Sequence, residues 1–558
     1  MRAFAAISLT ALLSGAAFSQ STEMPRFEVA DVHVSPHSAD PFPYLKGPFV
    51  RGGRYEVRTA TMLDLIATAY GLDGDKVLGG PSWLEMDRFE VLAKMPANST
   101  PEAQKAMLQA LLADRFKLAI HKDTKPMPAF ALTAGKRPTL KPADGSGETG
   151  CKFTPPPRPE AGSPVPMAPT FSYSCHNMTM AAFTEGMRDM VAAFQYLNGS
   201  PVADQTKLEG SWDFDFKYSL RGRIMPGGAA ADTITLFDAI DKQLGLKLDP
   251  ARIPMPVIVV DSVNRTPSGN APGVTESLHA VPVPTEFDVA VVKPTDADFR
   301  GMRFDMQPGG RVNLQGMTLK FLIEQAWNIN DDMLVGAPKW MDTDRFDIVA
   351  KATAAVAAGD PRSGPQIDED AVWAMMRALL ADRFKLATHR EDRPVSAYTL
   401  LAIKPKLKKA DPASRTRFKE GPATPDDDKP PEKTKDPRAA NPALSRLVTC
   451  QNMTMAQFAE KLQSIAPGYI HSPVLDATGL NGAWDFTLSF SPAGMFRGGG
   501  GRGGDAVQPP GAGAEASDPG GGLTLLEAVE KELGLKLEMQ KRPISVLVID
   551  HVEQKPDN

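Results

Sequence analysis

Residues 79–89 of this 558-residue chain read GGPSWLEMDRF, and residues 336–346 repeat the pattern as GAPKWMDTDRF. The sequence around this stretch also recurs, because LLADRFKL stands unchanged at residues 111–118 and at residues 379–386. A stretch that recurs together with its flanking sequence indicates the duplication of a whole folding unit. The sequence therefore predicts two tandem homologous repeats that share one fold.

Within each repeat, strand patterns alternate with short capped helices. Alternating apolar residues predict strands at residues 27–34 and 287–292. Thr61 and Asp64 form a capping box that begins a helix, and Gly71 ends that helix. Helices of about ten residues are marginal alone, so they must pack their apolar faces on a sheet. The expected fold class is α+β, with the short strands and short helices of each repeat arranged in two lobes.

The second part of each repeat carries further strand patterns. In the first repeat, residues 117–121 and residues 129–133 are predicted to form two strands. Residues 246–248 begin another strand, and the strongly β-forming residues 257–263 form the strand that closes the repeat.

Composition along the chain places the boundaries of these units. Arg2 followed by the apolar run at residues 3–17 and small residues at the cleavage positions predicts a secretory signal peptide. Two segments rich in proline, charge or glycine cannot bury enough apolar surface to offset ordering entropy, so we expect disordered inserts there. The expected division is a signal peptide at 1–19, a first repeat at 24–265, a linker at 266–285 and a second repeat at 286–555 with disordered inserts at 404–442 and 494–522.

Overall composition excludes some classes of function. The chain is 42% hydrophobic and 23% charged, with a net charge of −5, so it lacks the basic footprint of a nucleic-acid-binding protein. After the predicted signal peptide, no apolar run is long enough to span a bilayer. We therefore expect a secreted or periplasmic protein with no membrane span in its mature chain.

Three cysteines suit an oxidising compartment with few disulfides. We expect a Cys151–Cys175 disulfide that closes a proline-rich loop of the first repeat. Cys450 aligns with Cys175, whereas the position of Cys151 corresponds to Thr416 in the second repeat. Cys450 is therefore either a buried inert thiol or a reactive one, and both readings stay open.

No recognised catalytic, metal or cofactor motif occurs in the chain. The eight histidines are scattered, without a His-Glu-x-x-His motif or zinc-ligand spacing. His121 and His389 do recur after the LLADRFKL stretch, with Asp123 and Glu391 close by in the sequence. They are weak functional candidates, as a general base or ligand, or structural histidines at a strand end. No cofactor is predicted.

The repeated arginine and tryptophan positions have two readings. The triplet Asp-Arg-Phe occurs four times, and its guanidinium forks suit either a substrate anion or structural carboxylates and carbonyls. The two tryptophans of the opening stretch suit either a sugar-stacking platform or packing between helix and sheet. We favour the structural role for the whole set, which comprises Trp83, Arg88, Arg115, Trp340, Arg345 and Arg383.

As a set, these motifs resemble a known family. The set includes Phe-Glu/Asp-Val at the start of each repeat, Gly-x-Pro-x-Trp, LLADRFKL, Leu-Gly-Leu-Lys-Leu and the ending VIDHVE at residues 548–553. It is similar to the Solibacter-type secreted domain-of-unknown-function family expanded in soil acidobacteria, over about residues 27–265 and 287–558. The resemblance implies no established activity, cofactor or catalytic residue. Some relatives are fused to membrane metallopeptidases, whose zinc motif and membrane helices are missing here.

Three hypotheses for function follow. The favoured one is a non-catalytic binding module of the cell envelope, which holds an unknown envelope protein, for instance by strand addition at a sheet edge. The second is an envelope hydrolase with a site near His121 and His389. The third is a carbohydrate-binding module that uses Trp83 and Trp340.

Overall fold

The computed structural model describes most of the chain between Pro25 and Asp557. The predicted signal peptide lies outside the described residues, as do residues 421–442 of the first predicted insert and residues 494–522, the second. The described ranges are 25–36, 44–155, 170–191, 193–197, 200–219, 234–278, 285–296, 298–299, 301–307, 309–352, 356–357, 366–420, 446–491, 493 and 523–557.

Lobe 1 of each repeat is a four-stranded antiparallel sheet with two helices packed on one face. In the first repeat the strand order is β1 (Val29–Val34), β5 (Arg88–Lys94), β3 (Arg54–Thr61) and β2 (Lys46–Arg51), with helices α1 (Met62–Tyr70) and α2 (Pro101–Arg115). In the second repeat it is β13 (Val289–Pro294), β17 (Arg345–Lys351), β15 (Arg311–Thr318) and β14 (Arg303–Gln307), with α7 (Leu319–Trp327) and α9 (Glu369–Arg383). The equal strand orders confirm the predicted duplication.

Lobe 2 repeats this plan with a second small sheet. Its strand order is β7 (Lys141–Pro142), β11 (Trp212–Ser219), β9 (Thr170–Met178) and β8 (Gly150–Thr154), with α3 (Met180–Gly186) and α5 (Leu236–Leu244). The second repeat has β21 (Lys408–Lys409), β25 (Ala483–Phe490), β23 (Arg446–Thr454) and β22 (Arg417–Glu420), with α10 (Met455–Ile465) and α11 (Leu525–Leu533). The α+β class and the two lobes per repeat are as predicted.

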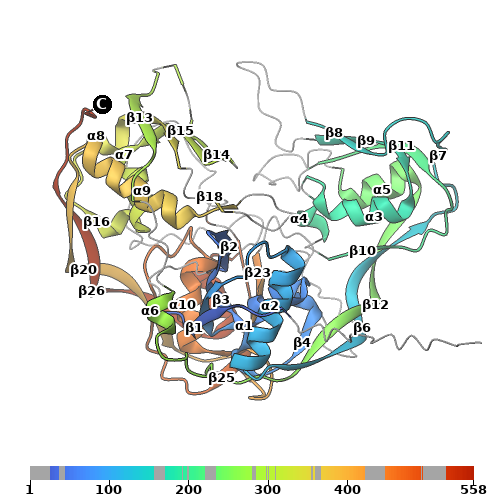
Figure 1. Ribbon diagram of the computed structural model, residues 1–558, viewed down its shortest axis with the longest axis horizontal. Helices are drawn as coiled ribbons and strands as arrows, with labels where there is room; N and C mark the ends of the chain where they lie inside the picture. Colours follow the sequence, from blue (N-terminus) through green and yellow to red (C-terminus); the bar gives the residue numbers. More distant parts are fainter. Residues whose placement is uncertain are drawn as a thin grey trace, which may run out of the picture.

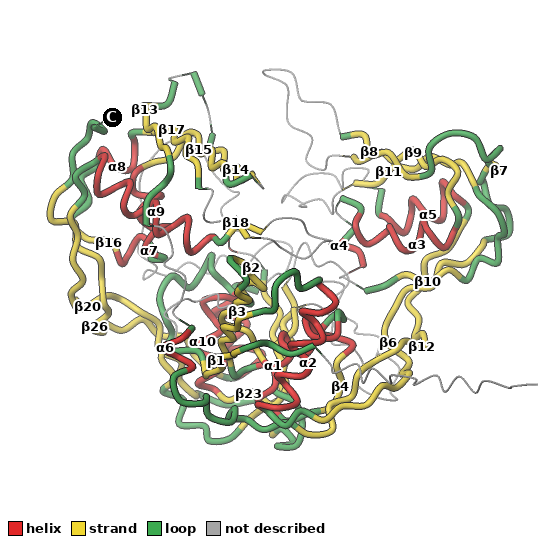
Figure 2. The backbone as a smooth tube through the Cα atoms, viewed as in Figure 1, coloured by secondary structure: helices red, strands yellow, loops and turns green. Residues whose placement is uncertain are grey.

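A long two-stranded ribbon connects the two lobes of each repeat, as the yellow strands of Figure 2 show. The ribbons pair β6 (Ala119–Ala134) with β12 (Leu246–Ser262), and β20 (Ala387–Ala402) with β26 (Leu535–His551). Short parallel strands flank them, namely β4 (Val77–Gly79), β10 (Val202–Asp204), β16 (Leu334–Val335) and β24 (Leu475–Asp476). Residues 119–121 and 129–133 therefore belong to one continuous strand, which corrects the prediction of two, and residues 117 and 118 lie before it.

Prolines inside the ribbon explain how the strands stay continuous. Pro126 lies opposite Pro254, and Pro128, Pro250 and Pro256 all fall on alternate pairs of the same series. Alternate pairs of an antiparallel ladder exchange no hydrogen bonds, so these prolines remove no donor from it. The ribbon thus tolerates a proline content that would interrupt an inner strand of a sheet.

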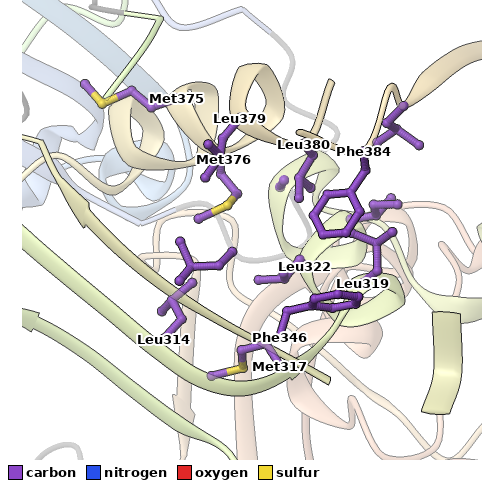
Figure 3. Packing of buried hydrophobic residues seen from close by; sticks show 14 of the residues in the cluster. Leu314, Met317, Leu319, Leu322, Phe346, Met375, Met376, Leu379, Leu380 and Phe384 are labelled. Carbon is purple, nitrogen blue, oxygen red and sulfur yellow. The ribbon is translucent and has the colours of Figure 1, made fainter. Parts of the chain in front are cut away.

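Four apolar clusters form the cores of the described lobes. Figure 3 shows the cluster in lobe 1 of the second repeat, where helix and sheet side chains interdigitate. Phe346 and Phe384, from two of the Asp-Arg-Phe triplets, meet edge to face with their ring centroids 4.9 Å apart. Phe89 and Phe116 form the equivalent pair in the first repeat at 5.0 Å. The repeated phenylalanines therefore fasten the second helix of lobe 1 to its sheet.

The two repeats interlock. Residues 415–417 of the second repeat contact Val77, Ser82 and Glu85 of the first, and Figure 1 draws the two lobes that hold them in one central region. Arg415, two residues before β22, donates to the carbonyl of Val77 at 2.6 Å across this contact. Lobe 1 of the first repeat and lobe 2 of the second thus form a central body. The ribbons lead from this body to the two outer lobes, one from each repeat.

Residues 404–420 of the first predicted insert are ordered, which corrects the expectation of disorder for this part. This part contains β21 and β22, and Arg415 is 7% exposed. Arg415, Thr416 and Arg417 bond to the first repeat, a compensation that composition alone does not reveal.

The cysteines lie on paired strands. Cys151 and Cys175 face each other across β8 and β9 and form a disulfide. Cys450 is a buried free thiol, and burial raises its pKa. The strand register places Phe418 opposite Cys450, so Phe418 and not Thr416 takes the place of Cys151. A low thiolate content and burial favour the inert reading of Cys450.

Candidate interaction surface of the second repeat

The two candidate histidines lie on the ribbons and bond to aspartates from the opposite strand. His121 Nδ1 is 2.8 Å from Asp261, and His389 Nδ1 is 2.8 Å from Asp550. Each histidine is about half exposed. The hydrogen bond that His389 donates to the carboxylate of Asp550 raises the pKa of His389 above its usual value.

The expected acidic neighbours play smaller parts at these sites. Asp123 pairs with Lys125, whereas Glu391 lies 3.5 Å from His389 and also pairs with Arg393. Among the described residues, no group of three or more His, Cys, Asp or Glu side chains is placed to hold a metal ion, at these ribbons or elsewhere. The hydrolase hypothesis therefore gains no geometric support from them.

The repeated arginines donate to backbone carbonyls. Arg88 donates to the carbonyl of Thr59, and Arg345 donates to that of Gly316 at the equivalent position. Arg115 donates to the carbonyls of Ser268 and Ala30, and Arg383 donates to that of Asp557. Trp83 and Trp340 are half-buried against the cores of their lobes. These contacts agree with the structural role that we favour for the set.

A group of ion pairs, which we call the clasp, joins lobe 1 of the first repeat to the start of α9. Arg51 and Arg58 both donate to one oxygen of Asp368, at 2.8 and 2.7 Å. Lys46 donates to Asp370 at 2.8 Å. Burial alone would raise the pKa of Asp368, but the two arginines outweigh it and hold that pKa below its usual value. Asp368 is 1% exposed, so the clasp is centred on a buried carboxylate.

A cavity of about 220 Å³ lies beside the clasp. Its charged groups already bond across the two repeats, through the clasp and through Tyr44 Oη, which lies 3.3 Å from Glu369. We therefore interpret this cavity as the open space between the two sides of the clasp, and not as a separate binding site. It is lined by Tyr44, Leu45, Lys46, Gly47, Phe49, Ile367, Asp368, Glu369 and Asp370.

The linker covers the outer face of the sheet in lobe 1 of the first repeat. Asn270 accepts from the backbone N–H of Val32 at 3.2 Å and donates to Asp31 at 2.5 Å. Asp31 is 6% exposed, although it points away from the helices. The short helix α6 (Val274–Ser277) follows and lies beside β1 in Figure 1. This face of the first repeat is therefore already covered by the protein's own chain.

The equivalent face of the second repeat exposes valines. Val291, which occupies the position of Asp31, is 52% exposed, and Val289 is 65% exposed. Val349 lies opposite Val291 on β17 and is 38% exposed. We call these three residues the valine strip. Cross-strand pairing places exposed cations on the same face, namely Lys293, Lys351 and Arg311.

Sequence reasoning missed these features for identifiable reasons. Asp261 and Asp550 are distant in sequence from their histidines and meet them through strand pairing. The valine strip looks like an ordinary strand, because alternation does not reveal whether a second layer covers it. A signal was present nonetheless: aligning the repeats shows that a buried aspartate, Asp31, becomes Val291.

The structure thus defines a two-repeat α+β protein whose first copy is covered by its own chain at a face that the second copy leaves exposed. The model of the DUF3738 family, described as a protein of unknown function, matches residues 63–263 and 320–552. The chain belongs to this family and carries two copies of its domain. No curated protein and no solved structure matches the chain. Among the described helices, none has both the length and the apolar composition needed to cross a membrane.

Proposed function

We propose that this protein is a non-catalytic binding module of the cell envelope, secreted or periplasmic, and that lobe 1 of the second repeat holds its partner. One observation carries the proposal: the face covered by the linker in the first repeat is exposed and apolar in the second. An exposed valine at the position of the buried Asp31, with Val289 and Val349 beside it, favours association with another apolar surface.

The first repeat indicates what kind of partner suits this face. There the covering group is an extended piece of polypeptide with a short helix, residues 268–278, held along β1. The cations around the valine strip favour acidic side chains in the corresponding segment of a partner. The proposed partner is therefore an envelope protein that presents an extended segment with apolar and acidic residues.

Peptide selection tests this proposal directly. The mature chain is used to select binders from a displayed library of random peptides, and Val291→Asp, which installs the residue of the first repeat, is used for counter-screening. Selected peptides should be rich in apolar and acidic residues and should lose binding to V291D. The matched control Val29→Thr alters the equivalent strand of the first repeat and should leave binding unchanged.

Two results would overturn the proposal. Peptides that bind V291D as tightly as the unaltered chain would show that the valine strip is not the binding face. Cell fractionation that finds an unprocessed chain in the cytoplasm would remove the envelope placement, whatever the peptides show.

A further inference from the structure

A second surface of lobe 1 is also occupied in the first repeat, by a segment of lobe 2 of the second repeat. The segment runs through residues 415–417 and is centred on Arg415, which is buried. Its contacts are Arg415 to the carbonyl of Val77 at 2.6 Å, Arg415 to Glu85 at 2.5 Å, Thr416 N to the carbonyl of Ser82 at 3.1 Å, and Arg417 to Glu85 at 3.1 Å. Lobe 1 of the first repeat thus binds an arginine-bearing extended segment through a carboxylate and backbone carbonyls.

The second repeat has the equivalent surface, and within the described part of the chain its contacts include no such segment. Strand pairing aligns the two sites, because Val77 pairs with Ile258 of its ribbon and Leu334 pairs with Leu547. Val77 is fully buried, whereas Leu334 is only half-buried. The exposure of the carboxylates differs in the same direction. The side chain of Glu85 is 20% exposed, and that of its counterpart Asp342 is 53% exposed.

This surface of the second repeat is more acidic than its counterpart. Lys320 Nζ bonds to Asp331 and lies 3.0 Å from Asp342. Glu324, one turn along α7 from Lys320, is half-buried, and burial followed by the charge of Asp331 raises its pKa to about 7. In the first repeat the positions of Lys320 and Glu324 hold Leu63 and Ala67. Three carboxyl groups thus surround one ammonium group. This set of groups is therefore negatively charged overall when its carboxyls are ionised, and this charge favours binding of an added cation. We call Lys320, Glu324, Asp331 and Asp342 the acidic face.

We propose that the acidic face binds an arginine-bearing extended segment of a partner protein, in the way that lobe 1 of the first repeat binds residues 415–417. The partner is not a second copy of this chain that offers its free lobe 2. Strand register aligns Arg417 with Gly150, so Glu148 takes the place of Arg415 in that lobe. A glutamate there would meet Asp342 and repel it. This inference does not depend on the valine strip, which lies on the outer face of the lobe 1 sheet.

A peptide with the sequence of residues 411–420 is the probe. Its binding to the full mature chain is measured by fluorescence anisotropy, with a peptide in which alanines replace Arg415 and Arg417 as the negative probe. We expect Asp342→Asn to weaken binding about tenfold, the effect of losing a charge-assisted hydrogen bond. The matched control Glu85→Gln lies in the site that the chain itself occupies, so it should leave peptide affinity unchanged.

The pH dependence supplies a second readout. The charged groups that face Glu324 are Lys320, Asp331 and Asp342, and within pH 6 to 8 we expect Glu324 to ionise. Peptide affinity should rise over this range, and Glu324→Gln should flatten the rise. The inference is overturned if the peptide does not bind or if it binds D342N with unchanged affinity. It is also overturned if E85Q and not D342N weakens binding, because the peptide would then be displacing residues 415–417 from the first repeat.

Discussion

Replacing Glu324 by glutamine should stabilise lobe 1 of the second repeat at neutral and alkaline pH. The pKa of this carboxyl is raised from 4.5 to about 7, because it is half-buried near Asp331. The folded state therefore holds a proton that the unfolded chain has lost, and stability falls as the pH rises from about 4.5 to about 7. A shift of this size corresponds to ~3 kcal/mol at most, and solvent screening of a half-exposed group reduces it to ~1–2 kcal/mol. Glutamine carries no charge at any pH and avoids this loss.

Urea unfolding at pH 8 and at pH 4.5, together with amide hydrogen exchange across α7, measures the effect. The free energy of unfolding of E324Q should exceed that of the unaltered chain by ~1–2 kcal/mol at pH 8 and should equal it at pH 4.5. Glu460→Gln, on an exposed position of α10, is the control and should change stability equally little at both pH values. A gain that is the same at both pH values, or a loss at pH 8, would refute the reasoning about Glu324.

Three further predictions concern the clasp, the core and the free thiol. Asp368→Asn should lower the free energy of unfolding in urea by ~3 kcal/mol, because it leaves two guanidinium groups without their buried carboxylate. Asp370→Asn, at a partly exposed position, should lower it by less than ~1 kcal/mol. Equal effects of the two variants would contradict the account of the clasp. Phe384→Ala should cost ~3–5 kcal/mol because it leaves Phe346 facing a void, and a loss below ~1 kcal/mol would contradict the packing role. Cys450 should react with a thiol reagent only after denaturation, and a thiol titrated quickly in the native protein would show that it is accessible.

Local signals in the sequence predicted the units of this fold well. Thr61 caps α1 in a capping box with Asp64, and Gly71 ends the helix in the left-handed conformation. Both features act within one helical turn, so neighbouring residues are enough to identify them. The duplication was equally visible, because both copies keep the residues that fasten helix to sheet.

Features that depend on distant parts of the chain were not predicted. Residues 404–420 read as disordered because their partners, Glu85 and the carbonyls near it, lie more than three hundred residues earlier in the sequence. The surfaces of the candidate site have the same origin. Val291 is notable only because the linker covers Asp31 in the other copy, which a single strand pattern does not reveal. Exposure is decided by tertiary packing, and the sequence pattern specifies only the alternation.

The interlocked central body constrains the order in which the protein is assembled. Val77 meets Arg415 across 338 residues of chain, so lobe 1 of the first repeat gains its cover only after most of the polypeptide has been synthesised. Closing so large a loop slows folding. A chain cut between the repeats would leave Glu85 and its neighbours uncovered, so the two halves should fold as parts of one molecule.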